Sequence, residues 1–181
     1  MSVLALDLSS TATGICEDVS NLGILGEPGT GWTATHAPKG DLLTRARSMR
    51  NTAESYARNH DLVVIEAIGT AYVGTAIAIA TVHALVLDAI ADDHRILVVS
   101  PKELKKWATG KGNADKTAML LAAKRSGWVD PPGATDDQAD AWWLWTIGHA
   151  TRGLWKVPET AYRAEVLDAI TNPKPKTRKP S

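Results

Sequence analysis

Residues 3–8 read VLALDL, an apolar run that holds a single acid, Asp7. A run of this length and composition is typical of a buried central strand. The carboxylate of Asp7 stands where an apolar side chain is expected, and burying an unpaired charge costs several kcal/mol. The stretch 61–67, DLVVIEA, repeats the pattern with Glu66 near its end. Neither run contains an Arg or Lys to neutralise its acid.

Further elements are predicted on either side of these two strands. Strands are also expected near 14–18, 31–36 and 95–100, with Gly14 as the bend after the first strand. Helices are expected at 41–59, within 70–90, at 101–108 behind Ser100-Pro101, at 114–126, from Thr135 onward and near 158–170. Three consecutive strands followed by alternating helices and strands predict an α/β fold, a mixed sheet with helices on its faces.

The composition predicts one soluble domain. The chain has 181 residues, of which 44% are apolar and 22% charged. Its formal net charge is zero, so no overall positive charge indicates a nucleic-acid or membrane partner. The domain is expected to cover 1–170, and the basic Pro/Lys tail 171–181 is expected to be disordered. Cys16 is the only cysteine, and no secretory signal opens the chain, so a cytoplasmic location is expected.

One apolar segment could form either a membrane-spanning helix or a helix in the core of a soluble protein. Residues 67–87 hold no Asp, Glu, Lys or Arg and are long enough to span a bilayer. However, the segment is rich in Gly, Ala and Thr, contains His83 and follows directly from a predicted strand. We therefore predict a buried helix of a soluble protein and no membrane partner.

A second group of acids lies in 135–145, TDDQADAWWLW. A capping box over 135–138 would place Asp136 and Asp137 in the first turn of a helix. Asp137 and Asp140 are three residues apart, so they point to the same side of that helix. Each acid alone also has an ordinary explanation, because first-turn carboxylates complement the helix dipole and Asp140 can be solvated.

Taken as a set, the acids predict a metal site. Two strand acids that face a helix bearing two more would repel one another without a cation. Oxygen ligands suit hard ions such as Mg²⁺ or Mn²⁺. Four carboxylates suit a pair of ions, which clamp the attacking and leaving oxygens of a phosphoryl transfer. The predicted metal ligands are Asp7, Glu66, Asp137 and Asp140.

In the first half of the chain, these residues resemble the RuvC-type Holliday-junction resolvases, nucleases of the ribonuclease H-like fold. After Asp7 comes LSSTATG, and the family carries Ser, Thr and Gly at the offsets of Ser10, Thr13 and Gly14. Glu66 ends the fourth strand at the family's usual distance from the first acid.

The resemblance continues in the second half. SPKELKKWATGKGNADK at 100–116 is similar, without a gap, to the family's Ser-Pro, Lys, Gly-x-Gly and Ala-Asp-Lys run. DQADA at 137–141 is similar to its closing pair of helix acids, and the similarity covers about 1–150. The chain departs from the pattern at Leu8-Ser9, where the family usually has Pro-Gly. It also departs after the fourth strand, where Ile68 or Tyr72 stands for the family's stacking aromatic.

The resemblance implies a ribonuclease H-like mixed five-stranded sheet with helices on both faces. It implies a homodimeric crossover junction endodeoxyribonuclease that nicks opposed strands of a four-way DNA junction or other branched DNA. Two Mg²⁺ ions per active site are implied, with Mn²⁺ as a substitute, and the short divergent chain suits a bacteriophage member. The implied catalytic residues are Asp7, Glu66, Asp137, Asp140 and Lys116. The implied DNA-binding residues are Lys105, Lys111, Lys116, Ser10, Thr13 and Tyr72.

Other functions were weighed against this one. An ATP-binding actin-like fold needs two such domains, and the chain is too short for them. A ribonuclease H that acts on RNA–DNA hybrids remains an alternative within the nucleases. A noncatalytic DNA-binding module remains a further alternative, although four acids would repel phosphate if no metal were present. The lysines of 102–116 also have an ordinary explanation as a solvated helix face.

Overall fold

A computed structural model describes residues 2–19, 29–69, 73–129 and 135–173. Its strands are β1 (Val3–Leu8), β2 (Ala12–Val19), β3 (Gly29–His36), β4 (Leu62–Glu66) and β5 (Arg95–Val99). Its helices are α1 (Leu42–Ala57), α2 (Val73–Ile90), α3 (Pro101–Thr109), α4 (Lys116–Arg125), α5 (Asp136–Ala150) and α6 (Ala161–Thr171). Every predicted strand and helix is therefore present in the described residues, within a few residues of its expected bounds.

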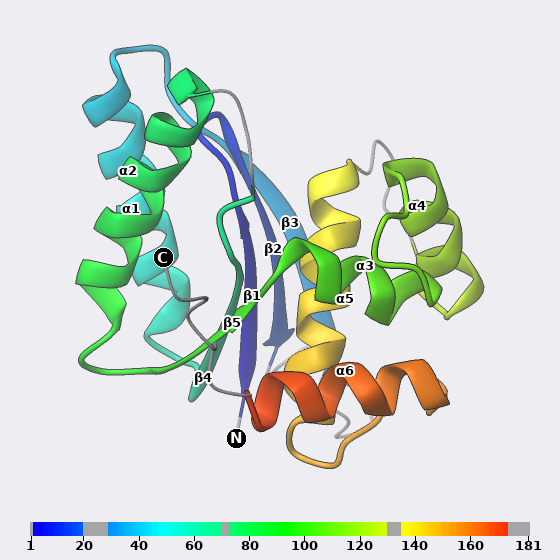
Figure 1. Ribbon diagram of the computed structural model, residues 1–181. Coiled ribbons are helices and arrows are strands. Elements are labelled where there is room, and N and C mark those ends of the chain that lie inside the picture. Colours follow the sequence, from blue (N-terminus) through cyan, green and yellow to red (C-terminus); the bar gives the residue numbers. More distant parts are fainter. Residues whose placement is uncertain (1, 20–28, 70–72, 130–134, 174–181) are drawn as a thin grey trace, which may run out of the picture.

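The strands form one mixed sheet in the order β3-β2-β1-β4-β5. The first three strands pair antiparallel, and β1, β4 and β5 pair parallel. Helices α1 and α2 cover one face of the sheet, and α3 to α6 lie on the other, with α5 against the strands (Figure 1). The predicted α/β fold with a five-stranded mixed sheet and helices on both faces is confirmed.

Successive side chains of β1 point to opposite faces of the sheet, and each face has its own hydrophobic core. Leu4, Leu6 and Leu8 pack with the side chains of α1 and α2. Val3 and Ala5 point the other way and pack with α5. Because side chains alternate along a strand, Asp7 belongs to the face that α5 covers.

Helix α5 is buried on nearly all sides, which explains its apolar sequence. Its indole rings are in the core, and two of them donate their N–H groups to acceptors there. Trp143 Nε1 donates to the carbonyl oxygen of Met119 at 3.2 Å, and Trp145 Nε1 donates to Asp18 at 3.1 Å. These contacts fix the helix against the sheet and against α4 and so fix its first turn, which carries acids.

Gly14 does not form the bend that the sequence suggested. The turn lies earlier, where the Ser9 hydroxyl donates to the carbonyl oxygen of Ala12 at 2.7 Å and accepts from the Ala12 N–H at 2.9 Å. Gly14 lies inside β2, opposite Asp7 of β1. Gly14 therefore has no part in the turn, and its lack of a side chain allows a close packing contact instead.

Helix α2 is less buried than predicted. Its C-terminal half packs inward through Val82, His83, Val86 and Ile90, whereas Val73 and Ile77 are 77% and 57% exposed. Among the described helices, α2 alone is long and apolar enough to cross a membrane, and 22% of that stretch is buried. The expectation of a buried helix thus holds for one half of α2, and its other half presents an apolar surface.

Candidate active site

The two strand acids come together at one edge of the parallel part of the sheet. Leu6 of β1 lies beside Ile65 of β4, so the next residues in this register are Asp7 and Glu66. Both side chains follow the strand alternation onto the face that α5 covers. The carboxyl ends of these strands thus bring together two acids that are far apart in the sequence.

The first turn of α5 brings the helix acids to the same place. A Cβ built on Gly14 would lie 1.9 Å from the carbonyl oxygen of Asp137, so α5 touches the backbone of β2 there. The start of α5 is fixed by a hydrogen bond from the Thr135 N–H to Gln138 Oε1 at 2.9 Å. Asp137 and Asp140, on one side of this helix, consequently face the strand acids.

The pKa values of these carboxyl groups reflect both burial and mutual repulsion. Burial, followed by the charges of Asp140, Glu66 and Asp137, raises the pKa of Asp7 well above its ordinary value. Burial and the charge of Asp140 raise the pKa of Glu66 to about 7. Burial also raises the pKa of Asp140 to about 6, although nearby Lys116 opposes the shift. The acids therefore form one coupled group, in which burial and mutual repulsion outweigh the nearby positive charge.

Two predicted lysines lie beside this group. Lys116 Nζ is 3.3 Å from Asp136 Oδ2, and its positive charge lowers the pKa values of Asp7, Glu66 and Asp140 against the larger effect of burial. Lys105 acts in the same direction on Glu66 and Asp140. Lys105 of α3 and Lys116 at the start of α4 therefore lie close enough to the acidic group to act on its charge.

The remaining predicted DNA contacts are scattered. Lys111 lies on the turn between α3 and α4 and lines a separate hollow. Thr13 is 2% exposed and donates its hydroxyl to Met49 Sδ at 3.3 Å, so its side chain faces the core, and its predicted role in DNA binding stays a prediction. Ser10 is half-buried in the turn after β1. Tyr72 lies outside the described residues, while Ile68 is 43% exposed.

No protein-family model matches the chain. Among solved structures, RuvC of Thermus thermophilus superposes with a TM-score of 0.64 at 18% identity, over 87% of this chain and 100% of that one. T. thermophilus RuvC in complex with a Holliday junction substrate superposes with a TM-score of 0.66 at 18% identity, over 87% of this chain and 99% of that one. The chain has a RuvC-like fold. These comparisons give no support to a bacteriophage origin, which stays a prediction.

Within this RuvC-like fold, the chemistry of the donor set fits hard divalent cations. All candidate ligands are carboxylate oxygens, and burial together with mutual repulsion raises the pKa values of Asp7, Glu66 and Asp140. A bound cation would relieve that repulsion. Among the described residues, no three His, Cys, Asp or Glu side chains stand close enough to hold an ion as they are. The carboxylates would therefore have to move toward a bound ion.

Sequence reasoning missed two contributions to the site. Asp136 was predicted in the first turn of the helix, with metal binding by Asp136 or Asp137 left open, but not as the ion-pair partner of Lys116 that it is. Gly14 appeared as a bend, yet it lets α5 approach the sheet. The signal for Asp136 was its position beside the metal-ligand candidates. No sequence pattern distinguishes a glycine at a packing contact from one in a turn.

Proposed function

We propose that this chain is a divalent-metal-dependent endonuclease that resolves four-way DNA junctions, or related branched DNA, by paired phosphodiester hydrolysis. The group of four carboxylates on β1, β4 and α5, faced by Lys105 and Lys116, carries the proposal. Half-buried acids that repel one another also repel phosphate, so they would be a liability in a protein that only binds DNA. The RuvC-like fold supports branched DNA as the substrate, because a similar protein is known in complex with a Holliday junction.

In this proposal, Asp7, Glu66, Asp137 and Asp140 hold two Mg²⁺ ions, which Mn²⁺ can replace. When bound, such ions supply positive charge to the attacking and leaving oxygens of the phosphodiester. The protein contributes the fixed positions of β1 and β4 and the first turn of α5. These elements are packed into the core, so the acids are presented by rigid structure rather than by loops.

Lys116 has the properties of a phosphate-positioning cation. Burial opposes its charge, but the hydrogen bond that Lys116 donates to Asp136 and the surrounding acids together raise the pKa of Lys116. Its ammonium group is therefore charged at neutral pH and stands next to the metal-ligand candidates. We infer that it exchanges Asp136 for a phosphate oxygen when DNA is bound.

Paired incision needs two active sites, and α2 supports a homodimer. The N-terminal half of α2 exposes Val73 and Ile77 without a covering element among the described residues. An apolar face of this kind suits a two-fold contact with the same face of a second copy. We propose that α2 forms this contact.

The proposal is tested by cleavage of labelled substrates in Mg²⁺. The substrates are a four-way junction, a flap, an RNA–DNA hybrid and a linear duplex, each with chelator and Asp7→Asn controls. We expect symmetric cuts in the junction and none in the controls. Preferential cutting of the hybrid would instead assign a ribonuclease H activity. Binding of the junction without cutting in any metal would assign a noncatalytic module.

A further inference from the structure

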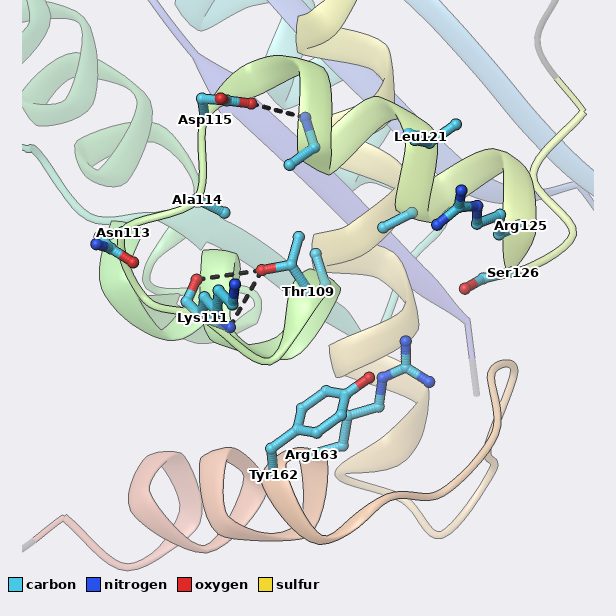
Figure 2. Close-up of a pocket in the computed structure, with 13 residues that line it drawn as sticks. Thr109, Lys111, Asn113, Ala114, Asp115, Leu121, Arg125, Ser126, Tyr162 and Arg163 are labelled. Carbon is cyan, nitrogen blue, oxygen red and sulfur yellow. Dashed lines mark hydrogen bonds between the residues drawn. The ribbon is translucent and has the colours of Figure 1, made fainter.

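A second concave surface lies apart from the acidic group, between α3, α4 and α6. It has a volume of about 620 Å³, which is within the usual range for ligand sites. Its walls are the end of α3, the following turn, the outer side of α4 and the start of α6 (Figure 2). We call it the basic hollow, because its lining includes Lys111, Arg125 and Arg163.

Arg163 is a buried cation without a counter-charge. It is 3% exposed, and its guanidinium donates to the carbonyl oxygens of Trp107 at 3.0 Å and Pro158 at 2.7 Å. The same group lies 5.4 Å from the ring centre of Trp143 and 5.5 Å from that of Tyr162. Among the described residues it has no carboxylate partner within 4.0 Å. The carbonyl oxygens and aromatic rings stabilise this positive charge, but no described carboxylate neutralises it.

The rest of the lining adds positive charge rather than cancelling it. Lys111 and Arg125 are exposed, and neither forms an ion pair with another described residue. The acid of the lining is Asp115, whose carboxylate accepts from the Ala118 N–H at 2.8 Å and caps α4 (Figure 2). Three cations thus face one engaged carboxylate, in a chain whose net charge is zero. The hollow fits an anion.

The shape of the hollow is fixed by packing. Tyr162 lies against the turn at Gly110, where a Cβ would be 3.6 Å from the tyrosine ring. Figure 2 shows the hydroxyl end of Tyr162 and the guanidinium of Arg163 rising from α6 toward α4. Arg125 of the same lining is exposed, and the planar guanidinium of an arginine can pair with two oxygens of a phosphate group. A phosphate is therefore the anion that best suits these donors.

The chain connects the basic hollow to the acidic group. The turn between α3 and α4 runs from Lys111, which lines the hollow, to Lys116, which pairs with Asp136. Five peptide units separate the two lysines, so their Cα atoms are at most ~18 Å apart. A DNA strand advances roughly 3.4 Å per phosphate along its axis. A DNA arm at the acidic group would therefore reach the hollow within about six phosphates.

We propose that the basic hollow binds one backbone phosphate of the DNA arm that leaves the acidic group past the α3–α4 turn. This proposal rests on the proposed nuclease function. It assigns Arg125 and Lys111 as the exposed contacts and Arg163 as the buried charge behind them. The contact would hold the register of the arm and would read no base sequence.

The test scans a four-way junction with single neutral methylphosphonate linkages, at seven positions on either side of each expected cut. Binding is measured in the Asp7→Asn background so that the DNA stays intact. We expect one or two linkages to lower the affinity about 3–10-fold, and Arg125→Ala to abolish that difference. Arg125→Ala should also lower affinity for the unmodified junction and reduce the salt-dependence slope by about one. The control, Arg47→Ala, removes an exposed arginine on α1 and should change neither quantity.

The outcomes separate this proposal from the function on which it rests. No junction binding by the starting protein would contradict the proposed function itself. Junction binding with no linkage that depends on Arg125 would overturn the basic hollow as a DNA contact. A free anion is the remaining occupant. If inorganic phosphate raises the Tm of the wild type but not of Arg125→Ala, and no linkage effect is found, the hollow serves a free phosphate and the DNA assignment is wrong.

Discussion

Gly14 of β2 lies in backbone contact with Asp137 of α5, since a Cβ on Gly14 would lie 1.9 Å from the Asp137 carbonyl oxygen. Gly14 is also the partner of Asp7 across the antiparallel pair of β1 and β2. A single position without a side chain therefore sets the separation between a strand acid and the helix acids. Any Cβ at this position must push the start of α5 away from the sheet.

Gly14→Ala should accordingly misplace the helix acids. We expect a loss of stability of about 1–3 kcal/mol, as for other overpacked sites, and at least ~10-fold weaker Mg²⁺ binding. Gly74→Ala is the matched control for Mg²⁺ affinity alone, because nothing lies within 4 Å of a Cβ there but the residue belongs to the proposed dimer helix α2. Urea unfolding and calorimetric Mg²⁺ titration measure the two effects. Unchanged Mg²⁺ affinity in folded Gly14→Ala would show that the α5 contact does not position the acids.

Asp7→Asn should separate chemistry from folding. The pKa of Asp7 is raised by burial and by the charges of Asp140, Glu66 and Asp137. Removing its charge should therefore raise the Tm of the metal-free protein at pH 8, and it should lower the cleavage rate by more than ~100-fold. Junction binding should remain. Melting curves in chelator and single-turnover cleavage in Mg²⁺ measure both; retained cleavage would remove Asp7 from the proposed site.

The pH dependence follows from the raised pKa values of Glu66, about 7, and Asp140, about 6. In the unfolded chain both groups titrate near pH 4. Their contribution to stability is therefore fully present below about pH 4 and is lost as the pH rises through 6 to 7. We expect the Tm of the metal-free protein to fall between pH 5 and pH 8, less so in Glu66→Gln. Mg²⁺ should restore the Tm at pH 8, where the carboxylates are ionised. A metal-free Tm that stays level over this range would contradict the coupling.

Lys116 and Asp136 should have different effects although they form one ion pair at 3.3 Å. Lys116→Ala should lower the single-turnover rate about 100-fold at saturating DNA, if the ammonium acts on the reacting phosphate. Asp136→Asn should alter the rate by less than about 10-fold, since the lysine then keeps its charge. Lys39→Ala removes an exposed lysine elsewhere and serves as the control. Equal losses in the Lys116 and Asp136 variants would mean that the pair is structural.

Hydrophobic patterning was enough to predict the sheet. Short apolar runs such as VLALDL are typical of buried strands, and Asp7 and Glu66 stood out inside two of them. The capping pattern at Thr135 placed the start of α5 correctly. These are local signals, and the α/β order of elements follows from them.

Long-range packing was beyond the same reasoning. The sequence could not show that Gly14 contacts α5 or that Thr13 turns its hydroxyl to Met49, because both depend on which element covers which face. It also could not bring Arg163 next to Lys111 and Arg125, since α6 reaches them only in the folded chain. The exposed half of α2 was missed because an apolar helix has the same composition whether its own chain or another copy covers it.

The exposed half of α2 should behave as a dimer contact. Ile77 is 57% exposed, and a carboxylate placed there would be desolvated in a two-fold contact but solvated in a monomer. Ile77→Glu should therefore convert a dimer to a monomer in sedimentation at micromolar concentration, with the Tm nearly unchanged at low protein concentration. The control Leu154→Glu alters a side chain that is 53% exposed beyond the end of α5, on the other face of the sheet from α2 (Figure 1), and should leave the dimer intact. In junction cleavage, Ile77→Glu should lose the coordination of the two cuts, so that nicked intermediates accumulate before full resolution. A wild type that sediments as a monomer would contradict the proposed dimer and, with it, paired incision by two copies bound through α2.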